Sequence, residues 1–169
     1  MLTKFNKGVI TIRVASIMKN SIANGVGVRD VIFLQGCNHK CVGCHNPETW
    51  AIRGGYELTV DEILDELKDS PNPVTISGGE PLLQIPSLYD LLDGLERQGK
   101  RCWLYTGYTY NEIPHHILVE LAFYVDVLVD GRFEIEKKDL RLAFRGSSNQ
   151  RLIDLPNTIR NQEITLWRI

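Results

Sequence analysis

The chain has 169 residues, enough for one domain with a hydrophobic core and short for two. Hydrophobic residues make up 43% of it, charged residues 24%, and the formal net charge is -2. This charge argues against a strongly electrostatic nucleic-acid binder, while a local basic patch with Arg141, Arg145 and Arg151 stays an alternative. No apolar run reaches the roughly eighteen residues that span a bilayer. We therefore expect neither nucleic acid nor membrane as a partner. Residues 1–7 lack a signal-peptide pattern, which favours a cytoplasmic protein.

Strand-like runs recur along the chain. Residues 9–14 alternate in part and are interpreted as an edge strand. Residues 30–35 form a continuous apolar run, which is typical of a strand buried on both faces of a parallel sheet. Further strands are predicted at 74–77, 102–105, 125–129, 152–155 and 164–167.

Three helices are predicted between these strands. Residues 59–62 form a capping box that opens the first, whose apolar residues then repeat at helical spacing. The second has Ser87 as its predicted cap and ends at Gly99. The third is expected over 111–123, with Pro114 in its first turn.

Alternation of strands and helices predicts an α/β fold, a single domain over 1–169 with a mostly parallel sheet covered by helices. A closed eight-stranded barrel typically needs about 250 residues, so we expect an open, partial βα barrel. Chemistry should then lie where loops leave the C-terminal strand ends. Three such loops are the cysteine run after residue 36, residues 78–80, and residues 106–107.

Cysteines give the strongest chemical signal. Cys37, Cys41 and Cys44 have the spacing CxxxCxxC within one short loop. Three thiolates on a cluster that takes four ligands would leave one iron open to a substrate. Disulfides are disfavoured by a reducing cytosol and by the cramped spacing. Cys102 lies in an apolar strand and is interpreted as a buried core residue.

Spacing alone leaves three interpretations of this loop. The thiolates and His39 or His45 form a structural zinc site; they hold a [4Fe-4S] cluster with a substrate on the open iron; or a partner completes an electron-carrying cluster. The turn of Gly78, Gly79 and Glu80 favours the second interpretation. Its glycines allow close approach of backbone to a ligand, and its carboxylate suits an ammonium or hydroxyl group.

A longer pattern surrounds these cysteines. Residues 25–37 read GVGVRDVIFLQGC, and Cys41, Cys44 and Asn46 continue it. In this pattern the chain resembles the radical S-adenosylmethionine activases of glycyl-radical enzymes. Gly43 is a departure, because the wider superfamily often has an aromatic residue before the third cysteine.

Other segments resemble the subfamily that activates anaerobic ribonucleoside-triphosphate reductase. They are YTGY at 105–108, VLVDGRF at 127–133 and FRGSSNQR at 144–151. The likeness covers nearly the whole chain. Size agrees too, because related activases with an inserted ferredoxin-like domain carry many more cysteines.

The resemblance implies a mechanism. Cys37, Cys41 and Cys44 bind three irons of a [4Fe-4S] cluster, and S-adenosylmethionine chelates the fourth. Reduction then yields methionine and a 5′-deoxyadenosyl radical, which takes a hydrogen from a glycine α carbon in the large reductase subunit. The electron comes from an external one-electron reductant, for which flavodoxin is a family-level expectation. The alternatives are a radical enzyme acting on a small molecule and a non-catalytic electron carrier.

The resemblance also implies cofactor-binding residues. Gly78, Gly79 and Glu80 match the motif that holds the methionyl amino group. Gly43 and His45 are expected as backbone contacts to the same ligand. Asp130 either faces the site or serves a turn or a helix cap. No catalytic residue is predicted beyond the cluster ligands.

Three further features of the sequence give weaker signals. Asn46 is expected to orient the loop through Asx-type hydrogen bonds. Trp50 and Trp103 are interpreted as packing residues rather than stacking platforms. Some arginines of segment 141–151 are expected to face the reductase, because that segment interrupts the alternation of strands and helices.

Overall fold

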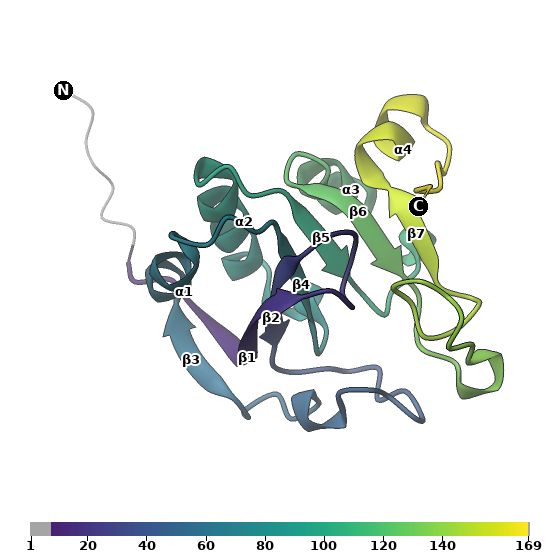
Figure 1. Ribbon diagram of the computed structural model, residues 1–169, viewed down its shortest axis with the longest axis horizontal. Helices are drawn as coiled ribbons and strands as arrows, with labels where there is room; N and C mark the ends of the chain where they lie inside the picture. Colours follow the sequence, from purple (N-terminus) through teal and green to yellow (C-terminus); the bar gives the residue numbers. More distant parts are fainter. Residues whose placement is uncertain (1–7, 169) are drawn as a thin grey trace.

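A computed structural model describes residues 8–168 of the chain. Residues 1–7, to which the signal-peptide expectation refers, lie outside this range. One seven-stranded sheet runs through the molecule in the order β3-β1-β2-β4-β5-β6-β7 (Figure 1). The strands are β1 (Thr11–Ser21), β2 (Arg29–Leu34), β3 (Tyr56–Thr59), β4 (Val74–Gly78), β5 (Cys102–Tyr105), β6 (Val125–Asp130) and β7 (Arg151–Asp154). The α-helices are α1 (Val60–Leu67), α2 (Ser87–Arg97), α3 (His115–Leu121) and α4 (Leu155–Asn161).

The centre of the sheet is parallel, as predicted. Strands β2, β4, β5 and β6 pair in parallel; α2 follows β4, α3 follows β5, and β7 with α4 follows β6. The remaining pairs, β1 with β2, β1 with β3 and β6 with β7, are antiparallel. The α/β class and the parallel core are therefore confirmed. All helices within residues 8–168 are too short or too polar to cross a bilayer.

The sheet edges differ from the predictions. Strand β1 is not an edge strand, because β3 pairs outside it through residues 11–14. Strand β3 was missed because its four residues, YELT, include no buried one and show no clear apolar pattern. The strand predicted at 164–167 is reduced to one isolated bridge, Leu166 with Ile153. These errors share a cause, since short edge strands bury too little surface to show a period.

The helix predictions hold in their centres and differ at their ends. Thr59 caps α1 through a complete capping box with Glu62. Ser87 is the first residue of α2 and Pro86 its N-cap, which corrects the predicted cap. The third helix is shorter than 111–123, because a 3-10 turn precedes Pro114, the N-cap of α3. Helix α4 was not predicted, and only its first residue, Leu155, lies in the strand predicted at 152–155.

The two faces of the sheet are built differently. Alternate strand residues such as Ile32, Ile76 and Leu104 join a large aliphatic core with side chains from all four helices. The other face carries Trp103 and a smaller cluster with Val127, Val129 and Leu152, against which Phe144 and Trp167 pack. Helices therefore cover one face, while the loop after β6 and the C-terminal segment cover part of the other. The three predicted loops meet at the C-terminal ends of the parallel strands.

Candidate metal centre

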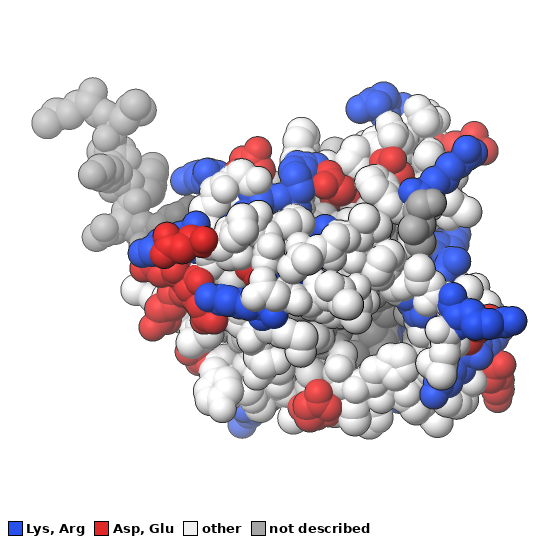
Figure 2. Space-filling model, viewed as in Figure 1, with Lys and Arg blue, Asp and Glu red and all other residues white. Residues whose placement is uncertain are grey.

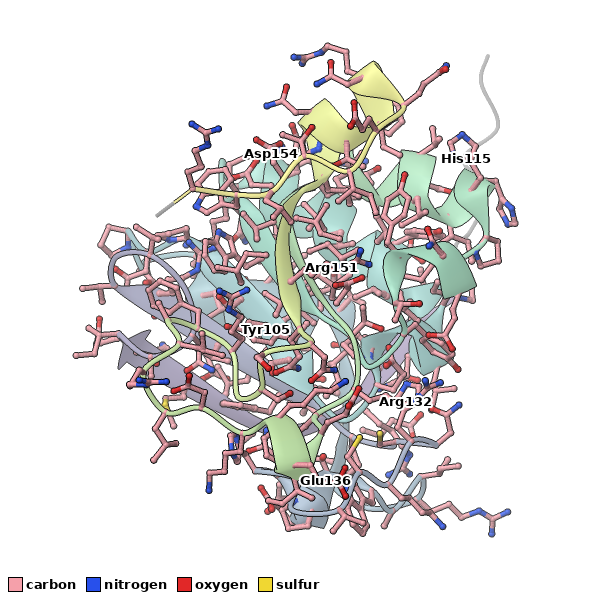
Figure 3. All side chains as sticks on the ribbon, turned by 90° about the vertical axis from the view of Figure 1, so that its right-hand side faces the viewer. Tyr105, His115, Arg132, Glu136, Arg151 and Asp154 are labelled. Atoms are coloured by element: carbon pink, nitrogen blue, oxygen red, sulfur yellow. The ribbon has the colours of Figure 1, made fainter. Side chains whose placement is uncertain are left out.

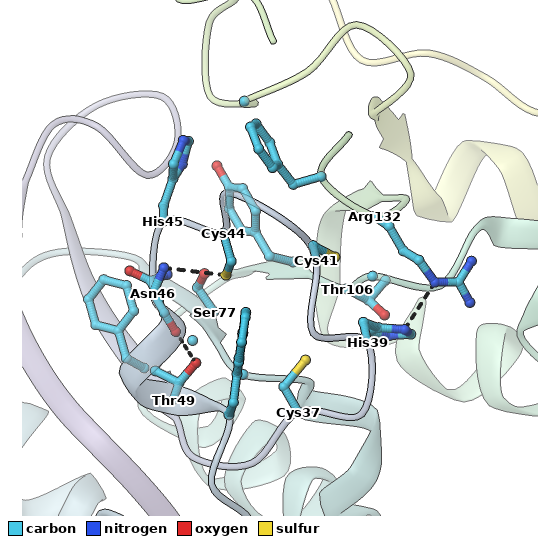
Figure 4. A pocket seen from close by; sticks show the side chains of 18 of the residues that line it. Cys37, His39, Cys41, Cys44, His45, Asn46, Thr49, Ser77, Thr106 and Arg132 are labelled. Atoms are coloured by element: carbon cyan, nitrogen blue, oxygen red, sulfur yellow. Dashed lines mark hydrogen bonds between the residues drawn. The ribbon is translucent and has the colours of Figure 1, made fainter. Parts of the chain in front are cut away.

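A cavity of about 270 Å³ lies at the C-terminal ends of the parallel strands. Cys37, Cys41 and Cys44 line it, and so do Gly78 and Gly79 after β4 (Figure 4). The loops after β5 and β6 contribute further wall residues. The fold thus brings together the cysteine loop and the Gly-Gly turn, as the sequence predicted.

The cysteine loop presents three free, half-buried thiols. It closes on itself through a hydrogen bond of 3.1 Å from the Cys44 N–H to the Cys41 carbonyl. The backbone N–H of Asn46 lies 3.4 Å from the Cys44 Sγ. Burial raises the pKa of the Cys41 thiol, and a backbone hydrogen bond from Phe133 opposes this shift. A bound metal ion would instead lower the pKa of the thiol, because coordinated thiols are deprotonated.

The donor set fits an iron–sulfur cluster. Among residues 8–168, no group of three or more His, Cys, Asp or Glu side chains converges on a point where one metal ion could sit. A four-iron cluster makes no such demand, because each cysteine binds a different iron. The Trp50 indole N–H is buried without a hydrogen-bond partner, and the Trp50 side chain lines the same cavity. Three thiols and the unpaired Trp50 N–H line one cavity, and this donor set suits an iron–sulfur cluster, whose sulfides accept hydrogen bonds.

The Gly78–Gly79 turn is held close to the start of the cysteine loop. Gly79 donates its N–H to the Leu34 carbonyl at 2.8 Å, and Glu80 donates to the Gly36 carbonyl at 2.7 Å. A Cβ at Gly78 would collide with the Leu34 backbone, and one at Gly79 with Gly36. Gly78 also has φ +104°, which favours glycine. Both glycines are therefore required by the close contact between two strand ends.

The Glu80 carboxylate points into the protein rather than into the cavity. It is fully buried and accepts from the Leu82 N–H at 3.0 Å and the Gly107 N–H at 2.8 Å. The Thr106 hydroxyl and the His39 Nε2 also bond to it, at 2.9 Å and 2.8 Å. Glu80 does not line the cavity, whereas Gly78 and Gly79 do. Backbone groups of the turn are thus better placed than this carboxylate to meet a ligand.

Gly43 and His45 lie on the outer side of the cysteine loop. Gly43 has φ +74°, and a Cβ there would come within 2.8 Å of Ile135 and 3.3 Å of the Phe133 ring. His45 is exposed, lines the cavity and packs against Phe133 with ring centroids 5.0 Å apart. The space beside Gly43 is therefore occupied by Ile135 and Phe133, from the loop after β6.

Asp130 is engaged elsewhere. Its carboxylate forms an ion pair with Arg151 of the neighbouring strand and accepts from the Tyr110 N–H at 2.7 Å. Only 1% of the residue is exposed, and the cavity wall is formed by the next residue, Gly131. The geometry favours the turn role for Asp130, since its carboxylate joins β7 to the turn after β5.

Several wall residues were missed or assigned another role from sequence. Trp50 was interpreted as packing, yet it lines the cavity. Ser77 and Tyr105 sit where β4 and β5 end, a position that strand prediction identifies only once the sheet order is known. Asn46 orients the loop through its backbone: the Thr49 hydroxyl donates to its carbonyl at 2.7 Å, and its side chain makes no cap bond.

The remaining predictions concern packing and surface charge. Cys102 is fully buried, and burial raises the pKa of its thiol to about 12, which confirms a core role. Trp103 packs against Phe144 and Trp167, as predicted. On the face shown in Figure 2, lysines and arginines gather to the right, where Figure 1 places the loop after β6. Within that loop Arg141 is exposed and paired with Asp139.

Comparison with known proteins agrees with this site. Residues 23–153 match the family described as a 4Fe-4S single cluster domain. Proteins named anaerobic ribonucleoside-triphosphate reductase-activating protein are 36% identical in Escherichia coli strain K12 and 38% in Vibrio cholerae, over 76% of this chain and 90% and 89% of theirs. One from Enterobacteria phage T4 is 38% identical over 76% of this chain and 85% of its own. The chain therefore belongs to the family of anaerobic ribonucleoside-triphosphate reductase-activating proteins and contains a 4Fe-4S single-cluster domain.

Proposed function

We propose that this chain uses one [4Fe-4S] cluster to cleave S-adenosylmethionine reductively and to install a glycyl radical on the large subunit of anaerobic ribonucleoside-triphosphate reductase. The observation that carries the proposal is the shared cavity. Cys37, Cys41 and Cys44 form one wall of it, and the Gly78–Gly79 turn forms another. Membership of the activating-protein family supports the reaction and the protein substrate.

The roles proposed for the chain's own residues are binding and orientation. Cys37, Cys41 and Cys44 would each hold one iron, which leaves a fourth iron for the substrate. When bound, the cluster supplies the electron that breaks the sulfonium bond of S-adenosylmethionine. Gly78 and Gly79 would bring backbone groups against the methionyl end of the substrate, as the close-packed turn allows.

The outer cavity wall suits the rest of the substrate. Phe133 and His45 present rings at its edge, and Gly43 lies directly against Phe133. We propose that Phe133 replaces the ring that other members of the superfamily carry before the third cysteine. A wall of rings there would also exclude water from the reacting groups.

We also propose the partial βα barrel of the radical S-adenosylmethionine superfamily for this sheet. The parallel order β2-β4-β5-β6 and the helices on one face support it. The helix-free face would then be the barrel interior, with the cavity at its upper rim. A cytoplasmic location and an external one-electron reductant, flavodoxin for instance, belong to the same proposal.

Anaerobic reconstitution tests the function. The chain is loaded with iron and sulfide, reduced, and mixed with S-adenosylmethionine and the large reductase subunit. We expect 5′-deoxyadenosine and methionine as products and a glycyl-radical doublet in the electron paramagnetic resonance spectrum of the reductase.

Other results would separate the alternatives. An electron carrier would form no 5′-deoxyadenosine. A radical enzyme for small molecules would turn over without any protein partner. Formation of 5′-deoxyadenosine without a radical on the reductase would refute the assigned protein substrate. A reductase whose radical-bearing glycine is replaced by alanine serves as the control.

A further inference from the structure

We propose that His39 is a positioning residue, a clamp that fixes the cysteine loop to the Gly78–Glu80 turn. Its role would be to keep a constant spacing between the cluster ligands and the backbone that meets S-adenosylmethionine. This inference rests on the proposed function and deepens it. His39 lies between the first two cysteines in sequence, and its ring reaches the turn after β4.

The central contact joins His39 and Glu80. The His39 Nε2 lies 2.8 Å from the Glu80 Oε2, and the two side chains are 5% and 0% exposed. A hydrogen bond to a charged carboxylate that is shielded from water is stronger than one at the surface. The bond links two segments that are 41 residues apart in the chain.

A second contact sets the tautomer of the imidazole. The Arg132 Nε donates to the His39 Nδ1 at 3.1 Å, so Nδ1 accepts and Nε2 carries the proton given to Glu80. Arg132 is itself held by Glu112 at 3.2 Å. Figure 4 shows Arg132 beside His39 and near the cysteines, and Figure 3 shows Arg132 below Arg151 at one end of the sheet. Both ring nitrogens are occupied, so in this arrangement neither is free to bind a metal.

The loop after β5 packs against the His39 imidazole. The Tyr108 ring meets it edge-on with centroids 4.5 Å apart, and the Tyr108 hydroxyl accepts from Asn38 at 2.8 Å. A side chain at Gly107 would collide with the His39 ring, so the glycine makes room for it. Four loops therefore converge on one histidine: its own and those after β4, β5 and β6.

The distribution of bonds predicts which part loosens without His39. The Glu80 carboxylate keeps its bonds from Thr106, Gly107 and Leu82, so the turn stays in place. Among residues 8–168, the side-chain bonds that anchor the segment from Cys37 to Cys41 are those of His39 and Asn38 and the backbone hydrogen bond from Phe133 to the Cys41 thiol, and only the His39 bond reaches the turn after β4. Removal of the His39 side chain should leave the fold and the thiols intact and disturb the distance between cluster and substrate.

Three variants test the clamp in the reconstituted enzyme. His39→Ala removes both bonds, while His39→Gln retains one donor and one acceptor. The exposed histidine His116, remote from the cavity lining, provides the control His116→Ala. For each protein we would measure bound iron and sulfide, the paramagnetic resonance spectrum of the reduced cluster with and without S-adenosylmethionine, and KM and kcat for 5′-deoxyadenosine formation.

We expect His39→Ala to bind iron and sulfide at the wild-type level and to raise KM for S-adenosylmethionine about tenfold, the loss typical of one charge-assisted hydrogen bond. The kcat should change by less than about threefold, because bound substrate restores the spacing. The spectral change caused by S-adenosylmethionine should need a correspondingly higher concentration. His39→Gln should recover most of the loss, and His116→Ala should match the wild type.

If His39→Ala folds poorly, a further variant, Arg132→Ala, and a further measurement, hydrogen exchange, still test the clamp. Arg132→Ala leaves the imidazole in place but frees its Nδ1, and should raise KM about two- to threefold, as expected of a half-exposed partner. Backbone hydrogen exchange in Arg132→Ala should be slightly faster in residues 37–44 than in the wild type and unchanged at Leu82.

The outcomes distinguish this inference from the proposed function. If the wild type does not cleave S-adenosylmethionine, the function fails. If the wild type cleaves it and His39→Ala keeps the wild-type KM and spectral titration, the clamp is refuted. Loss of iron from both His39 variants would also refute positioning, because it would make His39 part of the cluster-binding set.

Discussion

The polar groups at the two ends of strand β2 differ in burial and in hydrogen bonding. At its N-terminal end Arg29 and Asp30 are 4% and 0% exposed, and both are bound by neighbouring segments. At its C-terminal end follow Cys37, Cys41 and Cys44, which are half-buried and free. One end of the strand is a closed polar network outside the cavity, in which the Asp30 Oδ2 has no hydrogen-bond partner, and the other end is an open cavity.

Arg29 shows what a closed network does. Its Nε donates to the Thr75 hydroxyl and its Nη2 to the Val74 carbonyl, each at 2.7 Å, while the guanidinium lies 5.3 Å from the Trp103 ring centroid. Burial lowers the pKa of Arg29, although nearby acidic groups oppose the shift. Its donors are directed at protein atoms, so its role is structural.

Asp30 has a similar structural role. Burial works against ionisation, but hydrogen bonds from Asn72 and from the Asn20 backbone outweigh it and lower the pKa of Asp30. The comparison teaches that a buried charge does not by itself identify a functional site. Unpartnered donors and thiols around a shared cavity are the better sign, and only the cysteine end has them.

The largest expected effect distinguishes Cys41, which lines the cavity, from Cys102, which lies in the core. Cys41→Ala should abolish the four-iron cluster, because two thiolates remain where three are needed. Cys102→Ala should retain the cluster and lose only about 1 kcal/mol of stability, the size of a small core truncation. Iron and sulfide analysis after reconstitution measures the first effect and urea unfolding the second. Loss of the cluster from Cys102→Ala would overturn its assignment to the core.

The next effect tests the closed end. Arg29→Ala should lower the free energy of unfolding by about 2–3 kcal/mol, because the Val74 carbonyl loses a donor and Trp103 loses its packing partner. Cluster content and the rate of S-adenosylmethionine cleavage should stay at wild-type levels in the folded fraction. Arg97→Ala, which removes an exposed ion pair with Asp93, is the matched control and should leave stability unchanged. Loss of cleavage without loss of stability in Arg29→Ala would contradict a purely structural role.

The effect that is smallest near neutral pH is a pH dependence at the core cysteine. The folded chain holds the Cys102 proton up to a pKa of about 12, whereas the unfolded chain loses it near the ordinary value of about 8.5. The folded state therefore binds more protons in this window, so Cys102 makes stability fall as pH rises. The difference in unfolding free energy between wild type and Cys102→Ala should decrease by about 1.4 kcal/mol per pH unit above pH 8.5. Parallel pH profiles for the two proteins would show that Cys102 ionises readily in the folded state.

Prediction from sequence succeeded where a local pattern carries its own physical reason. The capping box at Thr59 and Glu62, the apolar strand β2 and the loop after it all follow from near neighbours in the chain. It failed at β3 and α4, where a short segment gains its structure mainly from the sheet beside it. Strand β1 was predicted at the edge because no feature of residues 9–14 indicates that the strand at 56–59 pairs with them.

The sequence by itself determined the thiol spacing, the Gly-Gly-Glu turn and the parallel core, because each depends on residues close together in the chain. Only the tertiary structure decided how the turn is used. It buries the Glu80 carboxylate under four donors, pairs Asp130 with Arg151 and brings His39 and Arg132 together across 93 residues. Such contacts depend on which strand ends lie side by side, and the strand order is a property of the whole sheet.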